Sequence, residues 1–259
     1  MAEEKKRSEI RVLYVGDVEA FQYHATPGLG SYVASGVLDE SIHLRSALAS
    51  DGAIEVTHMG GAEAMEQLPQ RVQDFQTYDV AILSDVIADS LLLYRDQRSL
   101  PPRPNRLVQI RDYVAAGGGL MMIGGWFSFG GLGGQARFHD TPIEEALPVA
   151  IKDGDDRCEL PEGCSLEVLE PEHPLLRRLP SWEEVLFAGY NRLTARPEAE
   201  VLARTSTGDP LLVVGRHGQG RTCAFAADCA PGWAGSMLSW AGYSRFWCRL
   251  VRYLAGEDS

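Results

Sequence analysis

The sequence predicts an α/β protein with a doubly wound, mostly parallel sheet, crossover helices and an antiparallel C-terminal extension. Through roughly the first 125 residues, short apolar runs alternate with helical segments, which is typical of a parallel sheet. After residue 149 the pattern changes to short strand-like runs separated by turn residues, which favours antiparallel pairing. A chain of 259 residues suits one large α/β domain, so residues 1–259 are interpreted as a single domain.

Four strands are expected in the first half, because each candidate is a short apolar or β-branched run that ends in a turn residue. They lie at 10–15, 54–58, 78–84 and 120–123. Crossover helices are expected at 39–50 with Asp39 as N-cap, at 62–75 with a break at Pro69, and at 105–116, ended by Gly117. Residues 17–36 show neither the apolar run of a strand nor the spacing of a helix and are expected to form a long loop. Long loops are often functional.

The second half is expected to be a β-rich extension of the same domain over residues 149–240. It is preceded by a short helix that Thr141 caps, with Pro142 at the first helical position and Glu144 completing a capping box. Strand-like runs follow at 185–190, 200–204, 211–216 and 221–227. An amphipathic helix at 243–254 closes the chain, with its apolar side chains on one face.

Composition and charge exclude several classes of function. The net charge of −12 argues against a nucleic-acid surface and against docking on anionic lipid. No apolar run approaches 20 residues, and residues 1–8 are charged, which indicates a frayed tail rather than a signal peptide. The five cysteines are scattered without a CxxC pair, so reduced thiols in a cytoplasm are expected, and no metal site and no cofactor are assigned.

The candidate site is the crevice at the carboxyl ends of the parallel strands, where ligands bind in open α/β sheets. Asp17 and Asp85 directly follow the first and third strands, and Asp228 ends a later one. A glycine-rich stretch at 117–141 follows the fourth strand and brings further candidates to the same edge. The ligand-binding candidates are Asp17, His24, Asp85, Gly125, Trp126, Ser128, Arg137, His139 and Asp228.

Each candidate also has an ordinary structural interpretation. Aspartates after strands often cap turns, and His24 and His139 suit acid–base chemistry near neutral pH but could be surface residues. The aromatic cluster Trp126, Phe127, Phe129 and Phe138 could line a pocket or join a subunit interface. Cys229 would be a nucleophile only beside a histidine, and a buried inert thiol is the commoner case.

The glycines do not indicate nucleotide binding. Gly124-Gly125 and Gly130-Gly131 lack the spacing and the following helix of a dinucleotide fingerprint, and the chain contains no phosphate-loop motif.

Several segments together resemble the class I glutamine-amidotransferase-like superfamily, in particular its uncharacterised "putative glutamine amidotransferase" branch, and more distantly trehalose-utilisation-type proteins. The matching segments cover nearly the whole chain: 15–17, 78–80 with 83–85, 113–129, 141–145, 155–157, 172–175 and 218–228. The resemblance implies a flavodoxin-like sheet. In active members a cysteine occupies a tight Gly-Xaa-Cys-Xaa-Gly elbow, but the matching position here holds Gly124, Gly125 and Trp126. The family's later His-Xaa-Glu pair is also missing, so the sequence predicts a protein without glutaminase activity.

Two functions remain open at this stage. The first is a protein that binds or transforms a small polar ligand in the crevice, with a sugar-like molecule as the guess from the distant resemblance, and with carboxylates and histidines for acid–base chemistry or for holding a metal. The second is a non-catalytic module that associates with itself through its aromatic loops. A homo-oligomer is expected in both cases, with no nucleic-acid or membrane partner, and whether the chain is an enzyme stays open.

Overall fold

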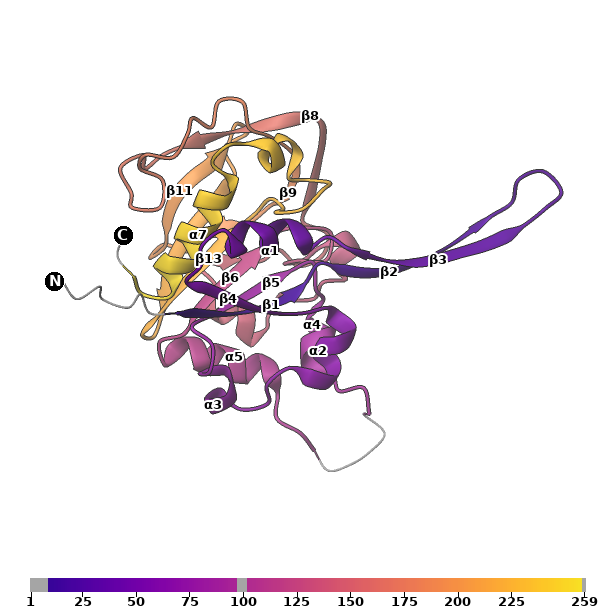
Figure 1. Cartoon of the computed structure of the whole chain (residues 1–259), viewed down its shortest axis with the longest axis horizontal. Helices are drawn as coiled ribbons and strands as arrows, with labels where there is room; N and C mark the ends of the chain where they lie inside the picture. The colour runs from indigo at the N-terminus through magenta and orange to yellow at the C-terminus, as the bar shows by residue number, and fades with distance from the viewer. Residues whose placement is uncertain (1–8, 97–101, 258–259) are drawn as a thin grey trace.

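A computed structural model describes residues 9–96 and 102–257, so the tail expected at 1–8 lies outside the described residues. The described chain is built on one nine-stranded sheet, in the order β4-β1-β5-β6-β13-β12-β11-β8-β9 (Figure 1). Helices cover both faces of its first half. The predicted fold class is therefore confirmed. No helix of the described residues has the length and apolar character that crossing a membrane requires.

The first half of the sheet is parallel. It consists of β4 (Ile54–Met59), β1 (Ile10–Gly16), β5 (Val80–Ser84), β6 (Gly119–Ile123) and β13 (Gly220–Phe225). Each of these strands runs parallel to its neighbour. Every residue of β5 and β6 is buried, as expected for strands covered on both faces. The shared direction brings the carboxyl ends of all five strands to one edge of the sheet.

The second half is antiparallel and consists of β12 (Pro210–His217), β11 (Glu200–Thr205), β8 (Arg157–Val168) and β9 (Leu186–Asn191). β13 joins the halves, because it is antiparallel to β12 and parallel to β6. The run at 221–227, expected in the antiparallel meander, therefore belongs equally to the parallel sheet.

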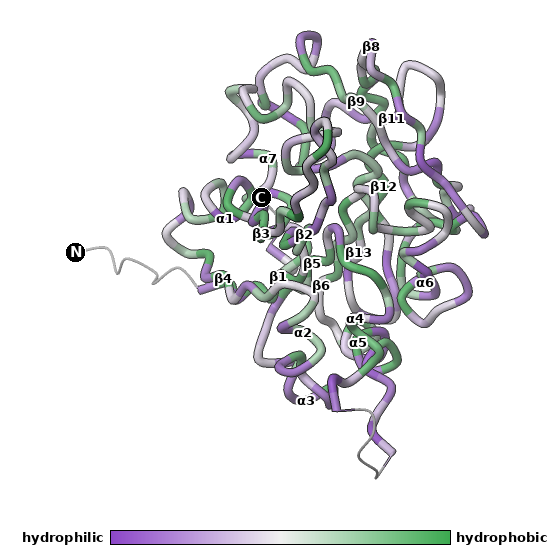
Figure 2. The backbone as a smooth tube through the Cα atoms, turned by 90° about the vertical axis from the view of Figure 1, so that its right-hand side faces the viewer, coloured by the Kyte–Doolittle hydropathy of each residue, from purple (hydrophilic) through white to green (hydrophobic). Residues whose placement is uncertain are grey.

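Helices lie on both faces of the parallel half. In Figures 1 and 2, α1 (Ile42–Ala49) and α7 (Tyr243–Leu254) lie on one side, and α2 (Gly61–Gln67), α3 (Val72–Phe75), α4 (Ala88–Leu92) and α5 (Arg106–Ala115) on the other. α7 has the predicted bounds and buries Phe246 and Trp247 completely. The helix expected at 62–75 is two short helices, α2 and α3, separated by Leu68–Arg71 around Pro69.

Two predicted helix starts differ in detail from the structure. α1 begins after Ser41 rather than Asp39, whose Oδ1 instead accepts from the Ser41 N–H at 3.1 Å. Thr141 caps α6 (Pro142–Ala146) as predicted, but Glu144 accepts from the N–H groups of Asp140 and Ile151, so the capping box is not closed. The remaining short elements are η1 (Leu132–Gly134), β7 (Val149–Ala150), β10 (Thr194–Ala195) and η2 (Gly235–Ser239).

The loop expected at 17–36 was a wrong prediction. It is a hairpin of β2 (Val18–Ala25) and β3 (Tyr32–Asp39), paired in register from Val18↔Asp39 to Ala25↔Tyr32. The hairpin projects far from the sheet (Figure 1), so its side chains gain no burial pattern that sequence periodicity could reveal.

Candidate functional site

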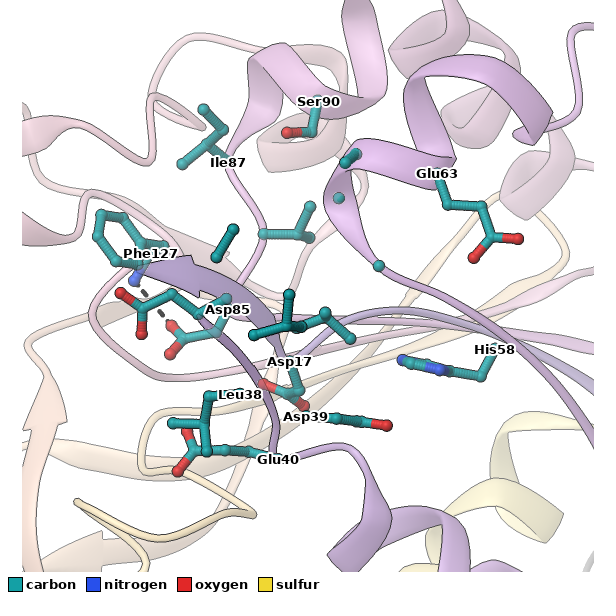
Figure 3. Close-up of a pocket in the computed structure, with 18 residues that line it drawn as sticks. Asp17, Leu38, Asp39, Glu40, His58, Glu63, Asp85, Ile87, Ser90 and Phe127 are labelled. Atoms are coloured by element: carbon teal, nitrogen blue, oxygen red, sulfur yellow. Dashed lines mark hydrogen bonds between the residues drawn. The ribbon is translucent and has the colours of Figure 1, made fainter. Parts of the chain in front are cut away.

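A cavity of about 720 Å³ opens at the carboxyl edge of the sheet, between the base of the hairpin and the starts of α2 and α4 (Figure 3). Its walls come from the ends of β1, β4 and β5, from both hairpin strands and from the loop after β6. The lining residues are Asp17, Val18, Glu19, Ala20, Val37, Leu38, Asp39, Glu40, His58, Gly60, Gly61, Ala62, Glu63, Asp85, Val86, Ile87, Ser90 and Phe127.

Asp17 lies at the floor of this cavity, directly after β1. Its oxygens accept from the hydroxyls of Tyr14 and, at 3.1 Å, Ser84. Its backbone is left-handed with φ 51°, and a Cβ on the preceding Gly16 would lie 1.6 Å from the Ser84 carbonyl oxygen, so only glycine allows this turn. Burial raises the pKa of Asp17, while the hydrogen bonds from Tyr14 and Ser84 oppose the rise.

Asp85 follows the neighbouring strand β5 in the same left-handed conformation, with φ 40°. Its Oδ1 accepts from the Phe127 N–H at 2.7 Å, and its own N–H donates to Ser128 Oγ at 3.0 Å. Burial, and after it the negative charge of Asp17, raises the pKa of Asp85 to about 7. A carboxyl group with such a pKa can both accept and donate a proton at neutral pH.

Asp228 is the third carboxylate of this group and lies just after β13. Its side chain is buried, and Oδ1 accepts from the Ala230 N–H at 2.9 Å. Burial raises its pKa well above the ordinary value, and the charges of Asp85 and Asp17 raise it further. Asp228 does not line the cavity. The rise in its pKa favours the protonated, neutral form, so Asp228 is not counted among the charged groups of the cavity wall.

The cavity wall is strongly acidic. Besides Asp17 and Asp85 it contains Glu19, Asp39, Glu40 and Glu63, and none of the described lining residues is Lys or Arg. His58 is the one titratable base in that lining, and its Nε2 lies 2.9 Å from the Gly16 carbonyl oxygen. Such a wall attracts positive charge.

The loop after β6 supports Asp85 through the predicted residues Gly125 and Ser128. A Cβ on Gly125, whose φ is 154°, would lie 2.1 Å from Asp85 Oδ1, and Ser128 is buried beneath the Asp85 backbone. Trp126 points elsewhere: it is 47% exposed, outside the cavity lining, and the Arg157 guanidinium lies 5.1 Å from its ring. Phe129 and Phe138 are fully buried in the core, and only Phe127 of the aromatic cluster lines the cavity.

Three predicted residues lie away from Asp17. His24 is exposed on β2 of the hairpin, opposite Val33. Arg137 and His139 line a second, smaller cavity of about 350 Å³, where Arg137 forms an ion pair with Asp89 at 2.8 Å. The single crevice expected from sequence is therefore two separate cavities.

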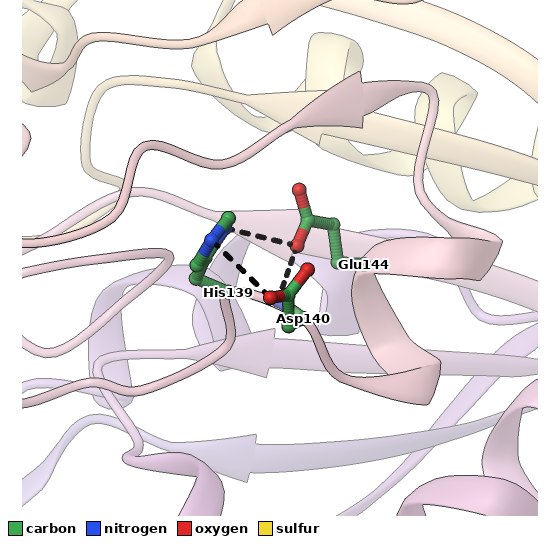
Figure 4. A group of neighbouring side chains, drawn as sticks. All are labelled: His139, Asp140 and Glu144. Atoms are coloured by element: carbon green, nitrogen blue, oxygen red, sulfur yellow. Dashed lines mark hydrogen bonds and ion pairs between the residues drawn. The ribbon is translucent and has the colours of Figure 1, made fainter.

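His139, Asp140 and Glu144 lie close enough together to resemble a metal site (Figure 4). Their contacts explain them as structural residues instead. Both Glu144 oxygens accept backbone N–H groups, and His139 Nδ1 lies 2.9 Å from the Ile151 carbonyl oxygen, a contact in which the ring nitrogen must donate.

Of the ligand-binding candidates predicted from the sequence, Asp17 and Asp85 are the ones that line this cavity. His58 is the clearest omission, because it lies near the carboxyl end of the second strand and the rule that selected Asp17 and Asp85 could have selected it. Glu19 and Asp39 could not be found in this way, since Glu19 was expected in a loop and Asp39 at a helix N-cap, whereas both belong to the hairpin. Cys229 is buried 3.7 Å from Asp17 Oδ2, and burial raises its pKa well above the ordinary value, which disfavours a thiolate.

Comparison with known proteins identifies the family. The sequence model of the family described as "Putative glutamine amidotransferase" matches residues 11–256. The chain belongs to this family. Two solved structures are similar throughout: cytoplasmic protein STM3548 from Salmonella typhimurium (33% identity, TM-score 0.89, covering 94% of this chain and 98% of that one) and cytoplasmic protein STM1381 from Salmonella typhimurium LT2 (35%, 0.89, 95% and 99%).

A more distant likeness extends to a ThuA-like protein from Parabacteroides merdae, with 15% identity, a TM-score of 0.57 and coverage of 97% of this chain and 92% of that one. At this identity it shows a shared fold only. No curated protein matches the sequence significantly. The fold and family membership inferred from the sequence are thus confirmed.

Proposed function

We propose that this member of the glutamine-amidotransferase-like family binds a small polar molecule carrying a positively charged amine in the cavity at Asp17 and Asp85, and does not hydrolyse glutamine. The observation that carries the proposal is the cavity wall itself, with six carboxyl side chains and no Lys or Arg among its described residues. A cationic group would neutralise that wall, whereas an anion would be repelled.

The wall also favours an amine over a neutral sugar. Ligand pockets for uncharged molecules are lined mostly by hydrophobic and aromatic side chains, but Phe127 is the one Phe, Tyr or Trp of the described lining. Trp126, which the sugar hypothesis placed in the site, lies outside the lining. An amino sugar, a diamine or an amino acid amide would each satisfy both the polar wall and the charge.

The position where an active amidotransferase holds its nucleophile has no room for one here. A Cβ on Gly124 would lie 2.1 Å from the Ala226 carbonyl oxygen, and one on Gly125 would lie 2.1 Å from Asp85 Oδ1. The Asp85 carboxylate therefore occupies the space above the elbow. Without a thiolate at this position the acyl-enzyme route from glutamine is closed.

A thermal-shift panel tests this proposal. The probes are putrescine, glucosamine, lysine, glutamine, glucose, glucuronate and Mg²⁺, added to the wild type, to Asp85→Asn and to the matched control Asp153→Asn, an exposed acid outside this lining. Saturation at 100 times the dissociation constant adds about 2.7 kcal/mol to the free energy of unfolding, or several degrees.

An amine-specific shift that Asp153→Asn retains and Asp85→Asn loses supports the proposal. A shift with glucose or glucuronate alone contradicts the charge argument, and a shift with Mg²⁺ alone replaces the amine with a metal ion. Release of ammonia from glutamine at an ordinary enzymatic rate would contradict the proposal that the protein does not hydrolyse glutamine.

The second function left open by the sequence is self-association through the aromatic loops. Phe129 and Phe138 of those loops are buried in the core, so we assign self-association to the exposed hairpin of β2 and β3 instead. We also place the protein in the cytoplasm, in line with its two relatives that are named cytoplasmic proteins. Neither statement depends on the amine site.

A further inference from the structure

The hairpin β2–β3, here called the arm (residues 18–39), is the most exposed apolar part of the described chain. It forms a sheet of its own, in which β2 and β3 pair only with each other among the described residues. Figure 1 shows it extending well beyond the body of the molecule. Isolated two-stranded hairpins are marginally stable in water, so an arm of this length is expected to need a partner surface.

One face of the arm is aromatic. Because residues opposite each other in an antiparallel pair share a face, the register Phe21↔Gly36, Tyr23↔Ala34 and Ala25↔Tyr32 places Phe21, Tyr23 and Tyr32 together. Their ring centroids are 6.4 Å apart from Phe21 to Tyr23 and from Tyr23 to Tyr32. A Cβ on Gly36 would lie 2.8 Å from the Phe21 ring, so glycine lets this ring lie flat on the neighbouring strand.

This aromatic face is open to solvent. Phe21 is 40% exposed, and Tyr23 and Tyr32 are each 52% exposed. The opposite face mixes the polar side chains of Gln22, His24 and Ser35 with the exposed side chains of Val33 and Val37, and carries none of the three rings. Half of an aromatic side chain corresponds to about 100 Å², so the three rings present roughly 300 Å² of apolar surface, the size of the largest apolar patch on a typical monomer, which is often functional.

We propose that the aromatic face of the arm packs against the same face of a second copy of this chain. Residues 20–38 contain no Asp, Glu, Lys or Arg, although the whole chain carries a net charge of −12. Two bodies of this charge repel each other, but two uncharged arms can meet beyond them. A stripe of three rings is also self-complementary under a two-fold axis, which is the usual symmetry of a homodimer.

Self-association through the arm would also order the cavity wall. Val18, Glu19, Ala20, Val37, Leu38 and Asp39 at the root of the arm line the cavity beside Asp17. A partner that holds the arm in place thereby holds these residues in place. The dimer itself is independent of the proposed amine ligand, since Phe21, Tyr23 and Tyr32 do not line the cavity.

The oligomeric state of the full chain tests the inference. Sedimentation velocity of the wild type is compared with Tyr23→Ser/Tyr32→Ser, with Phe21→Thr, and with the control Val33→Ser, which removes a side chain of similar exposure (58%) from the opposite face. The expected result is twice the mass of one chain for the wild type and Val33→Ser. The aromatic-face variants should weaken the dimer at least tenfold, and melting curves should show that the body stays folded.

A monomeric wild type at micromolar concentration overturns the proposal. So does an oligomer that all the aromatic-face variants retain, because the contact must then lie elsewhere. Equal weakening by Val33→Ser would contradict the assignment to the aromatic face. Because no ligand is added, these outcomes are separate from those of the thermal-shift panel.

Discussion

Asp85 and Asp156 are two aspartates that accept hydrogen bonds from the same glycine-rich loop, and they differ in the number of donors that their oxygens accept. Asp156 accepts the N–H groups of Gly130 and Gly131 and the Asn191 amide, each at 2.8 Å. Asp85 accepts one N–H, from Phe127, and otherwise faces the cavity. Asp156 is 2% exposed, whereas Asp85 is partly buried. The two also differ in the number of protein donors, and a carboxylate that the protein leaves short of donors can still receive a ligand.

Asn191 connects Asp156 to the loop that supports Asp85. Its Oδ1 accepts from the Gly125 N–H at 3.0 Å, while its Nδ2 donates to Asp156. Asp156 and Asn191 thus tie the antiparallel half of the sheet to the loop that positions Asp85. The cavity depends on this tie, although neither residue lines it.

The largest expected effect comes from removing the structural carboxylate. Asp156→Ala leaves three buried donors without an acceptor, and breaking a buried network of this kind costs about 3–5 kcal/mol of the free energy of unfolding. Urea unfolding followed by circular dichroism measures the loss.

Asp153→Ala is the matched control for this variant, because Asp153 is exposed in the same segment and should lose less than about 0.5 kcal/mol. Equal losses in the two variants would mean that the three hydrogen bonds do not stabilise the loop.

Asp85→Asn should stabilise the protein, and by less than Asp156→Ala destabilises it. The folded protein holds the pKa of Asp85 at about 7, above its ordinary 3.8, so stability falls as pH rises from about 4 to 7. Asparagine keeps an acceptor for the Phe127 N–H but cannot ionise. We expect the variant to gain about 2–4 kcal/mol over the wild type at pH 8, and nothing at pH 4.

Melting temperatures of both proteins from pH 4 to 8 measure this difference. A gain that persists unchanged at pH 4 would assign the effect to packing rather than to the cost of a buried charge. Loss of amine binding together with gained stability would show that the site trades stability for function.

The sequence was sufficient for the parallel sheet, because runs such as those at 80–84 and 119–123 are buried along their whole length and end at glycine or aspartate. The same logic found Asp17 and Asp85, since position after a strand is a local property. It could not find Glu19 and Asp39, because their strands extend away from the core and show no burial periodicity. It also merged two cavities into one, because Arg137 and His139 follow Trp126 closely in sequence but turn toward Asp89 and Ile151.

The smallest expected effect on stability concerns Asp155, a surface carboxylate whose pKa is shifted in the opposite direction from that of Asp85. The hydrogen bond from Arg157, and lesser ones from the Gly133 and Arg157 N–H groups, hold the pKa of Asp155 below its ordinary range. Its contribution to stability is therefore present above the unfolded pKa of about 4 and is lost as pH falls below it, the reverse of Asp85. Because the Asp155 side chain is 40% exposed, Asp155→Asn should cost only about 0.5 kcal/mol at pH 7. Melting curves at pH 3 and pH 7 measure the cost, and a cost that grows toward pH 3 would contradict the assignment of the lowered pKa of Asp155 to its hydrogen bonds with Arg157.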